Sequence, residues 1–229
     1  MHDDDRYYVL PTYAVCDESE SMSGDPIDAV NRQFKPLHDQ ITSDFEVCDI
    51  AHLGIISFSS TAQVLLPLSD LSSVEQLPGL TANGSTNYAA AFSLLRQQIA
   101  ADAQRLTNEG YTVLRPAVFF FSDGHPNGPE WKTPYSELVD EGFRQHPNMI
   151  AFGFGQADEH VIAQVGTLAA YQANDNVDAA EAVRKWAKAL TESIVASATA
   201  IKQGAASFVP PATPSGYTAI SPVPLDVVS

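Results

Sequence analysis

Residues 116–124 read PAVFFFSDG, an unbroken apolar run that ends in a Ser-Asp-Gly turn. A run this short, with no polar residue at alternate positions, predicts a strand that is buried on both faces. Residues 148–155, NMIAFGFG, have the same character. Strands covered on both faces are typical of parallel sheets flanked by helices, so these two runs indicate an α/β protein.

Helical patterns alternate with apolar runs along the rest of the chain. The strongest cover residues 87–106 and 178–202, and the second opens with DAAE, which fits a capping box. Residues 51–60 and 62–70 are two apolar runs separated by a few polar residues, which predicts a hairpin. The other predicted elements are strands at 12–16 and 169–173, the latter at an edge, and helices at 26–41, 134–145 and 158–165.

This order of elements predicts the fold class. We expect an α/β, Rossmann-like, doubly wound and mostly parallel six-stranded sheet, with one antiparallel edge strand and helices on both faces. The domain is expected to span residues 1–205. Residues 206–229 form a proline-rich tail with five prolines and no Lys or Arg, which is expected to be extended or flexible.

Composition narrows the function classes. The 229 residues include 28 acidic and 12 basic side chains, and the formal net charge is -16. Such a chain should avoid nucleic acid and anionic membranes, because Lys and Arg bind phosphate groups. No run reaches the roughly 18 apolar residues of a membrane span, and the acidic start MHDDDRYYVLP lacks the apolar core of a signal peptide. With two cysteines, Cys16 and Cys48, expected to stay reduced, the sequence predicts a cytoplasmic protein.

Three stretches with oxygen-bearing side chains follow strands or open helices. The first is DESES, with Asp17, Ser19 and Ser21 at alternate positions; the second is NGSTNYAAA, with Thr86; the third is FFFSDG, with Asp123. All three are predicted on the same rim of the sheet, beyond the carboxyl ends of its strands, where ligands bind in such folds. Carboxylate and hydroxyl oxygens are hard ligands, so the sequence predicts a site for Mg²⁺, with Ca²⁺ or Mn²⁺ as alternatives.

These residues also carry a family resemblance. The D-x-S-x-S motif, a distant Thr in a Gly-Ser turn and a later S-D-G after an apolar strand resemble the metal-ion-dependent adhesion site (MIDAS) of von Willebrand factor type A (VWA) domains. Within that family, Leu10 and Pro11 before the first strand, and the pattern SMSGxPI-AV over 21–30, are similar to bacterial VWA proteins associated with tellurium resistance. The resemblance covers roughly residues 8–203.

The resemblance implies a role for each motif position. Ser19, Ser21 and Thr86 would bind Mg²⁺ directly through their hydroxyls, and Asp17 and Asp123 would act mainly through water and hydrogen bonds to the ligands. A partner protein would supply an Asp or Glu carboxylate to the remaining coordination position. The implied function is a Mg²⁺-dependent protein-binding module without catalytic residues, in a bacterial tellurite or chemical-stress response.

One position departs from the family pattern. The family usually has Gly between the two serines, and this chain has Glu20. Glu20 either points to solvent or fills the open metal position and blocks a partner. We place it with Glu18, Ser85 and His125 on the rim that a partner would contact, and we expect Glu18 to be solvated.

Two alternatives to a binding module stay open at the level of sequence. The first is a magnesium-dependent phosphatase-like enzyme with Asp17 as nucleophile, although the chain lacks a phosphate-binding loop, a nucleophile elbow and an obvious Lys near the site. The second is a scaffold domain whose metal site is degenerate because Glu20 fills it. The sequence determines neither the partner nor the oligomeric state.

Overall fold

The computed structural model describes residues 7–205 and 208–225. Its centre is one sheet in the order β3-β2-β1-β5-β6-β7-β8, with the short β4 paired to β1. The strands are β1 (Tyr8–Asp17), β2 (Ala51–Phe58), β3 (Ala62–Asp70), β4 (Thr112–Val113), β5 (Ala117–Ser122), β6 (Asn148–Gly153), β7 (Ala169–Ala173) and β8 (Tyr217–Ile220). The inner strands are parallel, and the two outermost strands, β3 and β8, are antiparallel to their neighbours.

The doubly wound α/β fold with an antiparallel edge strand is therefore confirmed, but the number of strands is larger than expected. The sheet has eight strands rather than six, and β7 is an inner strand rather than an edge. One added strand is β4, a two-residue segment that pairs with the start of β1. The other is β8, which comes from the proline-rich tail, where no strand was expected.

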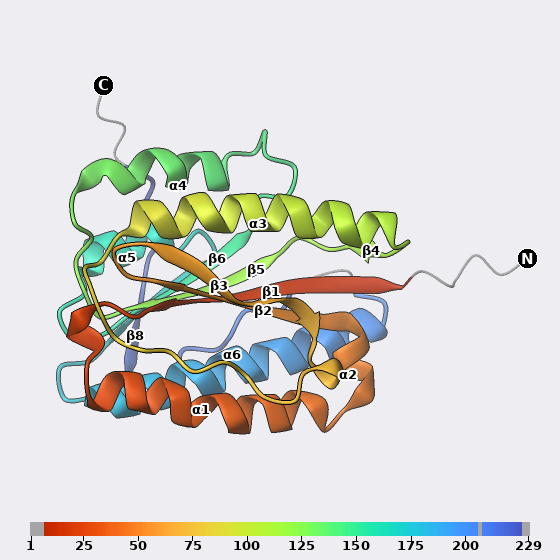
Figure 1. The fold of residues 1–229 in the computed structure, drawn as a ribbon, viewed down its shortest axis with the longest axis horizontal. Coiled ribbons are helices and arrows are strands. Elements are labelled where there is room, and N and C mark those ends of the chain that lie inside the picture. Colours follow the sequence, from red (N-terminus) through yellow and green to blue (C-terminus); the bar gives the residue numbers. More distant parts are fainter. Residues whose placement is uncertain (1–6, 206–207, 226–229) are drawn as a thin grey trace, which may run out of the picture.

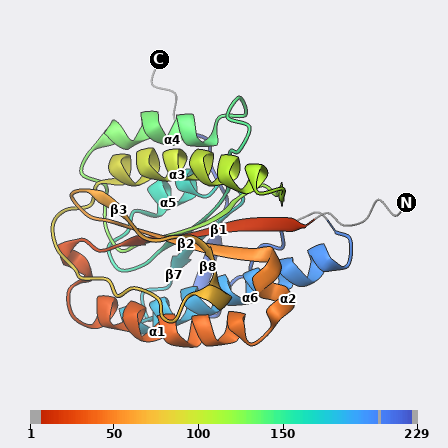
Figure 2. The ribbon, with the colours of Figure 1, turned by 45° about the vertical axis from the view of Figure 1, so that its right-hand side comes forward.

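Helices cover both faces of the sheet (Figures 1 and 2). One face carries α1 (Asp25–Thr42), α2 (Phe45–Ile50) and α6 (Ala179–Lys202), and the other carries α3 (Tyr88–Asn108), α4 (Lys132–Val139) and α5 (Glu159–Val165). Three short 3-10 helices complete the structure: η1 (Glu20–Met22), η2 (Leu71–Ser73) and η3 (Pro129–Trp131). The sheet thus separates two hydrophobic cores.

The three phenylalanines of the apolar run explain why β5 is buried on both faces. Phe121 points into the core under α6, where its ring stacks on Trp186 at 4.7 Å between centroids. Phe120 points into the opposite core, where it meets Tyr88 edge to face at 4.8 Å. Alternate side chains of a strand point to opposite faces, so an unbroken apolar run is what a two-sided core requires.

The described part of the tail packs on its own domain. Beyond the pairing of β8 with β7, the Tyr171 hydroxyl donates to the Pro211 carbonyl at 2.8 Å, and the Tyr217 hydroxyl donates to the Ala182 carbonyl at 3.1 Å. The Val223 amide donates to the Ala163 carbonyl at 3.0 Å. The described part of the tail covers one edge of the sheet.

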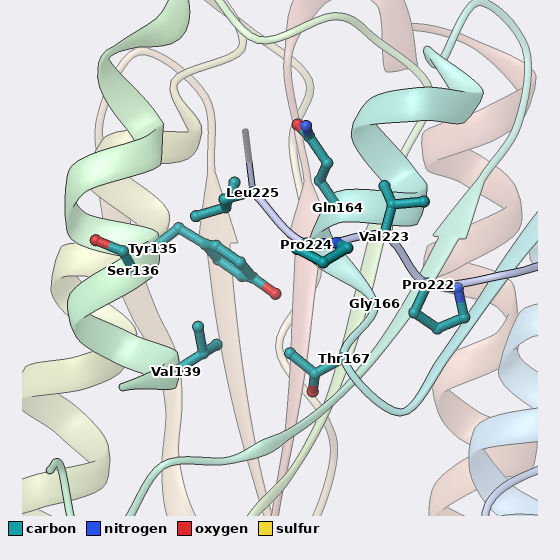
Figure 3. Close-up of a pocket in the computed structure, with 10 residues that line it drawn as sticks. All are labelled: Tyr135, Ser136, Val139, Gln164, Gly166, Thr167, Pro222, Val223, Pro224 and Leu225. Atoms are coloured by element: carbon teal, nitrogen blue, oxygen red, sulfur yellow. The ribbon is translucent and has the colours of Figure 1, made fainter. Parts of the chain in front are cut away.

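A pocket of about 390 Å³ lies between α4, α5 and the tail (Figure 3). Tyr135, Val139 and Leu225 line its apolar part, and the Tyr135 hydroxyl is already bonded to the Val165 carbonyl. None of the predicted metal ligands lines this pocket.

Among the helices in the described ranges, none has the length and hydropathy needed to cross a membrane.

Candidate metal centre

The strand order explains where the predicted ligands lie. In the sheet, β2 pairs with one side of β1 and β5 pairs with the other side. The strand order therefore reverses its direction between β1 and β5. Ligands bind at such a switch point, beyond the carboxyl ends of the strands. Asp17 ends β1 and Asp123 directly follows β5, and the register brings Cys16 opposite Phe121. The two carboxylates therefore lie on adjacent strands at the same edge.

The loop after β1 is organised around the Asp17 carboxylate. One carboxylate oxygen, Oδ1, accepts the Ser19 amide at 2.8 Å, and the other, Oδ2, accepts the Ser122 hydroxyl at 2.5 Å. The first bond turns the chain so that Ser19 and Ser21 bring their hydroxyls together, 3.0 Å apart. Asp17 itself is fully buried, so it acts on the loop rather than on solvent.

The other two motif positions meet the serines at the same point. The Ser21 hydroxyl donates to Asp123 Oδ1 at 2.7 Å. A Cβ placed on Gly124 would lie 3.2 Å from the Thr86 hydroxyl oxygen and 3.8 Å from that of Ser21, so both hydroxyls lie near Gly124. The structure thus brings all five predicted metal residues together at one end of the sheet.

The Thr86 hydroxyl does not cap α3, because the next residue does so. Asn87 is the N-cap of α3 and accepts the Ala90 amide at 3.1 Å. Asn127 holds Thr86 from the other side: its side chain accepts the Thr86 amide at 3.2 Å, and its amide donates to the Thr86 carbonyl at 3.0 Å. Thr86 is therefore fixed through its backbone, while its side chain faces Gly124 and Ser21.

Burial raises the pKa of both aspartates, Asp17 and Asp123. Desolvation raises the pKa of Asp17 to about 6, against the opposing effect of its hydrogen bonds from Ser122 and Ser19. Desolvation also raises the pKa of Asp123, which the hydrogen bond from Ser21 partly offsets. Two buried carboxylates without a neighbouring cationic side chain are poorly stabilised as anions, and a bound cation would supply the missing positive charge.

The donor set fits a hard divalent cation. Within the described ranges, no group of three or more His, Cys, Asp or Glu side chains could hold a metal ion, so a site here depends on hydroxyl oxygens. Three hydroxyls and two carboxylates converge, whereas both cysteines are buried as part of the hydrophobic core. Such oxygen ligands suit Mg²⁺, Ca²⁺ or Mn²⁺.

Glu18 corrects one expectation, because it is buried rather than solvated. Its side chain is 5% exposed and accepts a hydrogen bond from Gln63 Nε2 at 3.1 Å. Its backbone joins two loops: the Glu18 amide donates to the Phe58 carbonyl, and the Glu18 carbonyl accepts the Asn83 amide, both at 2.8 Å. Glu18 therefore supports the rim from below and offers little surface to a partner.

Glu20 lies on the surface of the rim. The residue is exposed, and its amide donates to the Gly84 carbonyl at 2.9 Å. Gly84 adopts φ +73°, and a Cβ there would lie 2.6 Å from the Ser60 hydroxyl, so this position favours glycine. The bond between the two loops uses only the backbone of residue 20, which explains how Glu can stand where the family has Gly.

The remaining rim residues, Ser85 and His125, are also exposed. The Ser85 hydroxyl lies 3.1 Å from that of Ser60 and accepts Asn127 Nδ2 at 3.0 Å. His125 Nδ1 lies 3.9 Å from a carboxylate oxygen of Asp158, an acidic residue that caps α5. Both therefore border the metal residues and present polar atoms to solvent.

Sequence reasoning missed three residues that build the centre: Ser122, Asn127 and Gly84. Ser122 stands beside Asp123 in the SDG turn, and its contact with Asp17 depends on the pairing of β1 with β5. Asn127 and Gly84 hold the second loop in place. A Gly before the Ser-Thr pair and an Asn after the SDG turn were visible signals, but only the fold assigns them partners.

The geometry gives no support to Asp17 as a nucleophile. Its side chain is fully buried, and both of its carboxylate oxygens already accept hydrogen bonds, from Ser19 and Ser122. A nucleophilic carboxylate has to reach the substrate with one oxygen, at close range. Asp17 is placed to orient Ser19 and Ser122 instead.

The raised pKa of Asp17 predicts that metal affinity depends on pH. A metal requires the deprotonated carboxylate, and a group with a pKa of about 6 is mostly protonated at pH 5. We expect the apparent Mg²⁺ affinity to fall about tenfold between pH 7.5 and pH 5, measured by calorimetry. A carboxylate with an ordinary pKa would leave the affinity nearly constant over this range, so a flat profile would contradict the assignment.

Comparison with known proteins agrees with the fold. Residues 13–190 match the model of the von Willebrand factor type A domain. No curated protein matches the chain in a sequence comparison. Among solved structures, proximal thread matrix protein 1 from the mussel byssus is 16% identical with a TM-score of 0.58, over 82% of this chain and 48% of that one. The ArnB paralog VWA2 from Sulfolobus acidocaldarius is 18% identical with a TM-score of 0.52, over 81% of this chain and 45% of that one.

The solved structures bear on the fold of this chain. The chain spans about half the length of the solved chains that it matches. At this level of identity the likeness concerns the fold alone. One of the mussel structures is described as having a zinc-occupied MIDAS motif. Because the family model covers most of this chain, the protein belongs to the von Willebrand factor type A domain family.

Proposed function

We propose that the protein is a binding module that engages a partner protein through Mg²⁺ held by Ser19, Ser21 and Thr86, with Asp17 and Asp123 in support. The observation that carries this proposal is the convergence of three hydroxyls and two carboxylates from three separate loops at the sheet's switch point. Direct ligands that are mostly neutral leave the cation electrophilic. An Asp or Glu side chain of the partner would then complete its coordination.

The exposed rim supports a macromolecular partner rather than a small substrate. Glu20, Ser85 and His125 surround the ligands with polar side chains at the surface, and none of the metal residues lines a described pocket. The net charge of -16 disfavours nucleic acid and anionic membranes as partners. We therefore propose a binding module and not an enzyme.

The biological setting is also a proposal. The similarity of Leu10, Pro11 and residues 21–30 to tellurium-resistance-associated proteins supports a role in a bacterial response to tellurite or other chemical stress. Two buried free thiols, Cys16 and Cys48, suit the reducing cytoplasm.

Thr86→Ala tests the proposed function, because it removes one ligand and leaves the backbone bonds to Asn127 in place. In calorimetry, Mg²⁺ should bind the wild type and lose at least about tenfold in affinity with the variant. In affinity capture from a lysate of the source organism, one protein should be retained in Mg²⁺ and released by EDTA, and Thr86→Ala should not retain it.

Thr199→Ala is the matched control, since Thr199 is exposed near the end of α6 and its hydroxyl donates to the Val195 carbonyl of the same helix. It should bind Mg²⁺ and the partner as the wild type does. Equal Mg²⁺ affinity in the wild type and Thr86→Ala would remove the basis of the proposal. Capture that survives EDTA would show that the partner does not bind through the metal.

A further inference from the structure

A second polar site lies at the opposite end of the sheet from the metal centre. The chain order leaves a notch there, between β4 and the loop that precedes β6. In Figure 1, β4 and the end of α3 lie on the right, whereas the loop from β1 to α1 lies on the left. The notch opens into a cavity of about 460 Å³.

The notch exists because β4 has a neighbour on one side only. The amides of Thr112 and Leu114 donate to β1, at the carbonyls of Tyr7 and Val9. On the other side, β6 begins to pair only where the Asn148 amide reaches the Pro116 carbonyl. Alternate amides of a strand point in opposite directions, so the Val113 amide faces away from β1 and toward the cavity.

The charge of this cavity is opposite to that of the protein. Its polar lining consists of Gln104, Thr107, Tyr111, Thr112, Arg115, Arg144 and Gln145, and no Asp or Glu is among the described residues that line it. In a chain with 28 acidic and 12 basic residues, a cavity with two guanidinium groups and no carboxylate is unusual. Positive charge of this kind attracts anions even when the net charge is negative.

Neither arginine has an ion-pair partner in the described structure. Five other basic residues do form ion pairs with described carboxylates: Lys35, Arg105, Lys185, Lys188 and Lys202. Arg115 and Arg144 are exposed at the cavity and form no ion pair with any residue of the described ranges. Their donors are therefore available to a ligand.

We propose that the notch binds a phosphate group between Arg115 and Arg144. Two guanidinium forks match the double charge and the several acceptor oxygens of phosphate, whereas a single carboxylate satisfies only one fork. Gln104, Thr107 and Gln145 add neutral hydrogen-bonding groups. The cavity is larger than phosphate itself, so it has room for a group attached to the phosphate. The ligand is therefore either free phosphate or a phosphate monoester.

Calorimetric titration in EDTA tests this site without the metal centre. The probes are inorganic phosphate and phenyl phosphate, with succinate as a dianion that lacks phosphate geometry. The wild type should bind at least one phosphate probe with a dissociation constant in the millimolar range or below, and more tightly than succinate. Tighter binding of phenyl phosphate indicates a monoester ligand; equal or weaker binding indicates free phosphate.

Arg115→Gln and Arg144→Gln should each weaken the binding at least tenfold. Arg184→Gln is the matched control, because Arg184 is exposed on α6, outside the cavity, and should not change the affinity. Arg115→Lys keeps the charge but removes the fork, so it should give an intermediate affinity if the protein folds normally. Absence of phosphate binding in the wild type, equal binding of succinate, or equal weakening by Arg184→Gln would overturn the proposal.

Discussion

Asp17→Asn should make the metal-free protein more stable while it strongly weakens the binding of Mg²⁺. In the folded protein, burial raises the pKa of Asp17 from 3.8 to about 6. A raised carboxyl pKa contributes stability that is present below pH 3.8 and is lost as the pH rises through 6, so at pH 7.5 the folded state carries a full penalty. The neutral amide removes this penalty, which is on the order of 2–3 kcal/mol.

The amide also preserves the hydrogen bonds of the loop. Its oxygen can accept the Ser19 amide, and its NH₂ group can donate to the Ser122 hydroxyl, which then acts as the acceptor. In EDTA, the melting temperature should therefore rise by roughly 5–10 °C. Added Mg²⁺ should raise the melting temperature of the wild type and leave that of the variant unchanged, since its Mg²⁺ affinity should fall about 100-fold or more.

Asp49→Asn is the control for the change of charge, because Asp49 is exposed and lies outside the metal centre. It should alter neither the melting temperature in EDTA nor the response to Mg²⁺. An Asp17→Asn variant that is less stable than the wild type in EDTA would mean that the hydrogen bonds of the carboxylate outweigh the penalty of burying its charge.

A chain that ends at residue 205 should lose about 4–6 kcal/mol of its free energy of unfolding, from lost apolar burial and unpaired hydroxyl groups. Removal of the tail withdraws the buried Tyr217 and the ring of Phe208, which packs edge to face on Phe119. It also leaves the Tyr171 hydroxyl without its acceptor, Pro211. Urea denaturation measures the change, and β7, newly exposed at the sheet edge, should promote aggregation.

Substitutions at two adjacent residues of β8 distinguish the contribution of side-chain packing from that of strand pairing. Tyr217→Ala removes a buried ring that meets Phe152 at 5.7 Å, and it should reproduce much of the loss. Thr218→Ala changes an exposed side chain on the same strand and should cost little. The division of the chain into a domain at 1–205 and a tail is still a prediction; a 1–205 chain as stable as the full chain would support it and contradict the role assigned to β8.

The sequence predicted the fold class because its clearest patterns are strands that are apolar on both faces. The apolar runs at 116–124 and 148–155 have no polar alternation, and only burial on both faces explains that pattern. It did not predict β8, because the run YTAI is only four residues long and stands between prolines. β8 forms since it completes the edge of β7 and buries Tyr217, which is a tertiary effect.

The meeting of the five proposed metal residues was predictable for a different reason. Asp17, Ser19 and Ser21 form a local motif, and Thr86 and Asp123 each follow a recognisable turn. Glu18 was not predictable, because nothing local distinguishes it from Glu20. Glu18 is buried because its backbone bonds to both Phe58 and Asn83, which draws its side chain toward Gln63.

The spread of the proposed metal residues along the chain has a consequence for when a cation could bind. Ser21 and Asp123, which share a hydrogen bond, are 102 positions apart, and they meet only after β1 and β5 have paired. An unfolded chain would have to close a loop of that length before it could offer both ligands. We therefore expect the proposed cation to bind only after these loops have formed. It should slow unfolding and leave the refolding rate unchanged, because it stabilises the native state and not the transition state for folding.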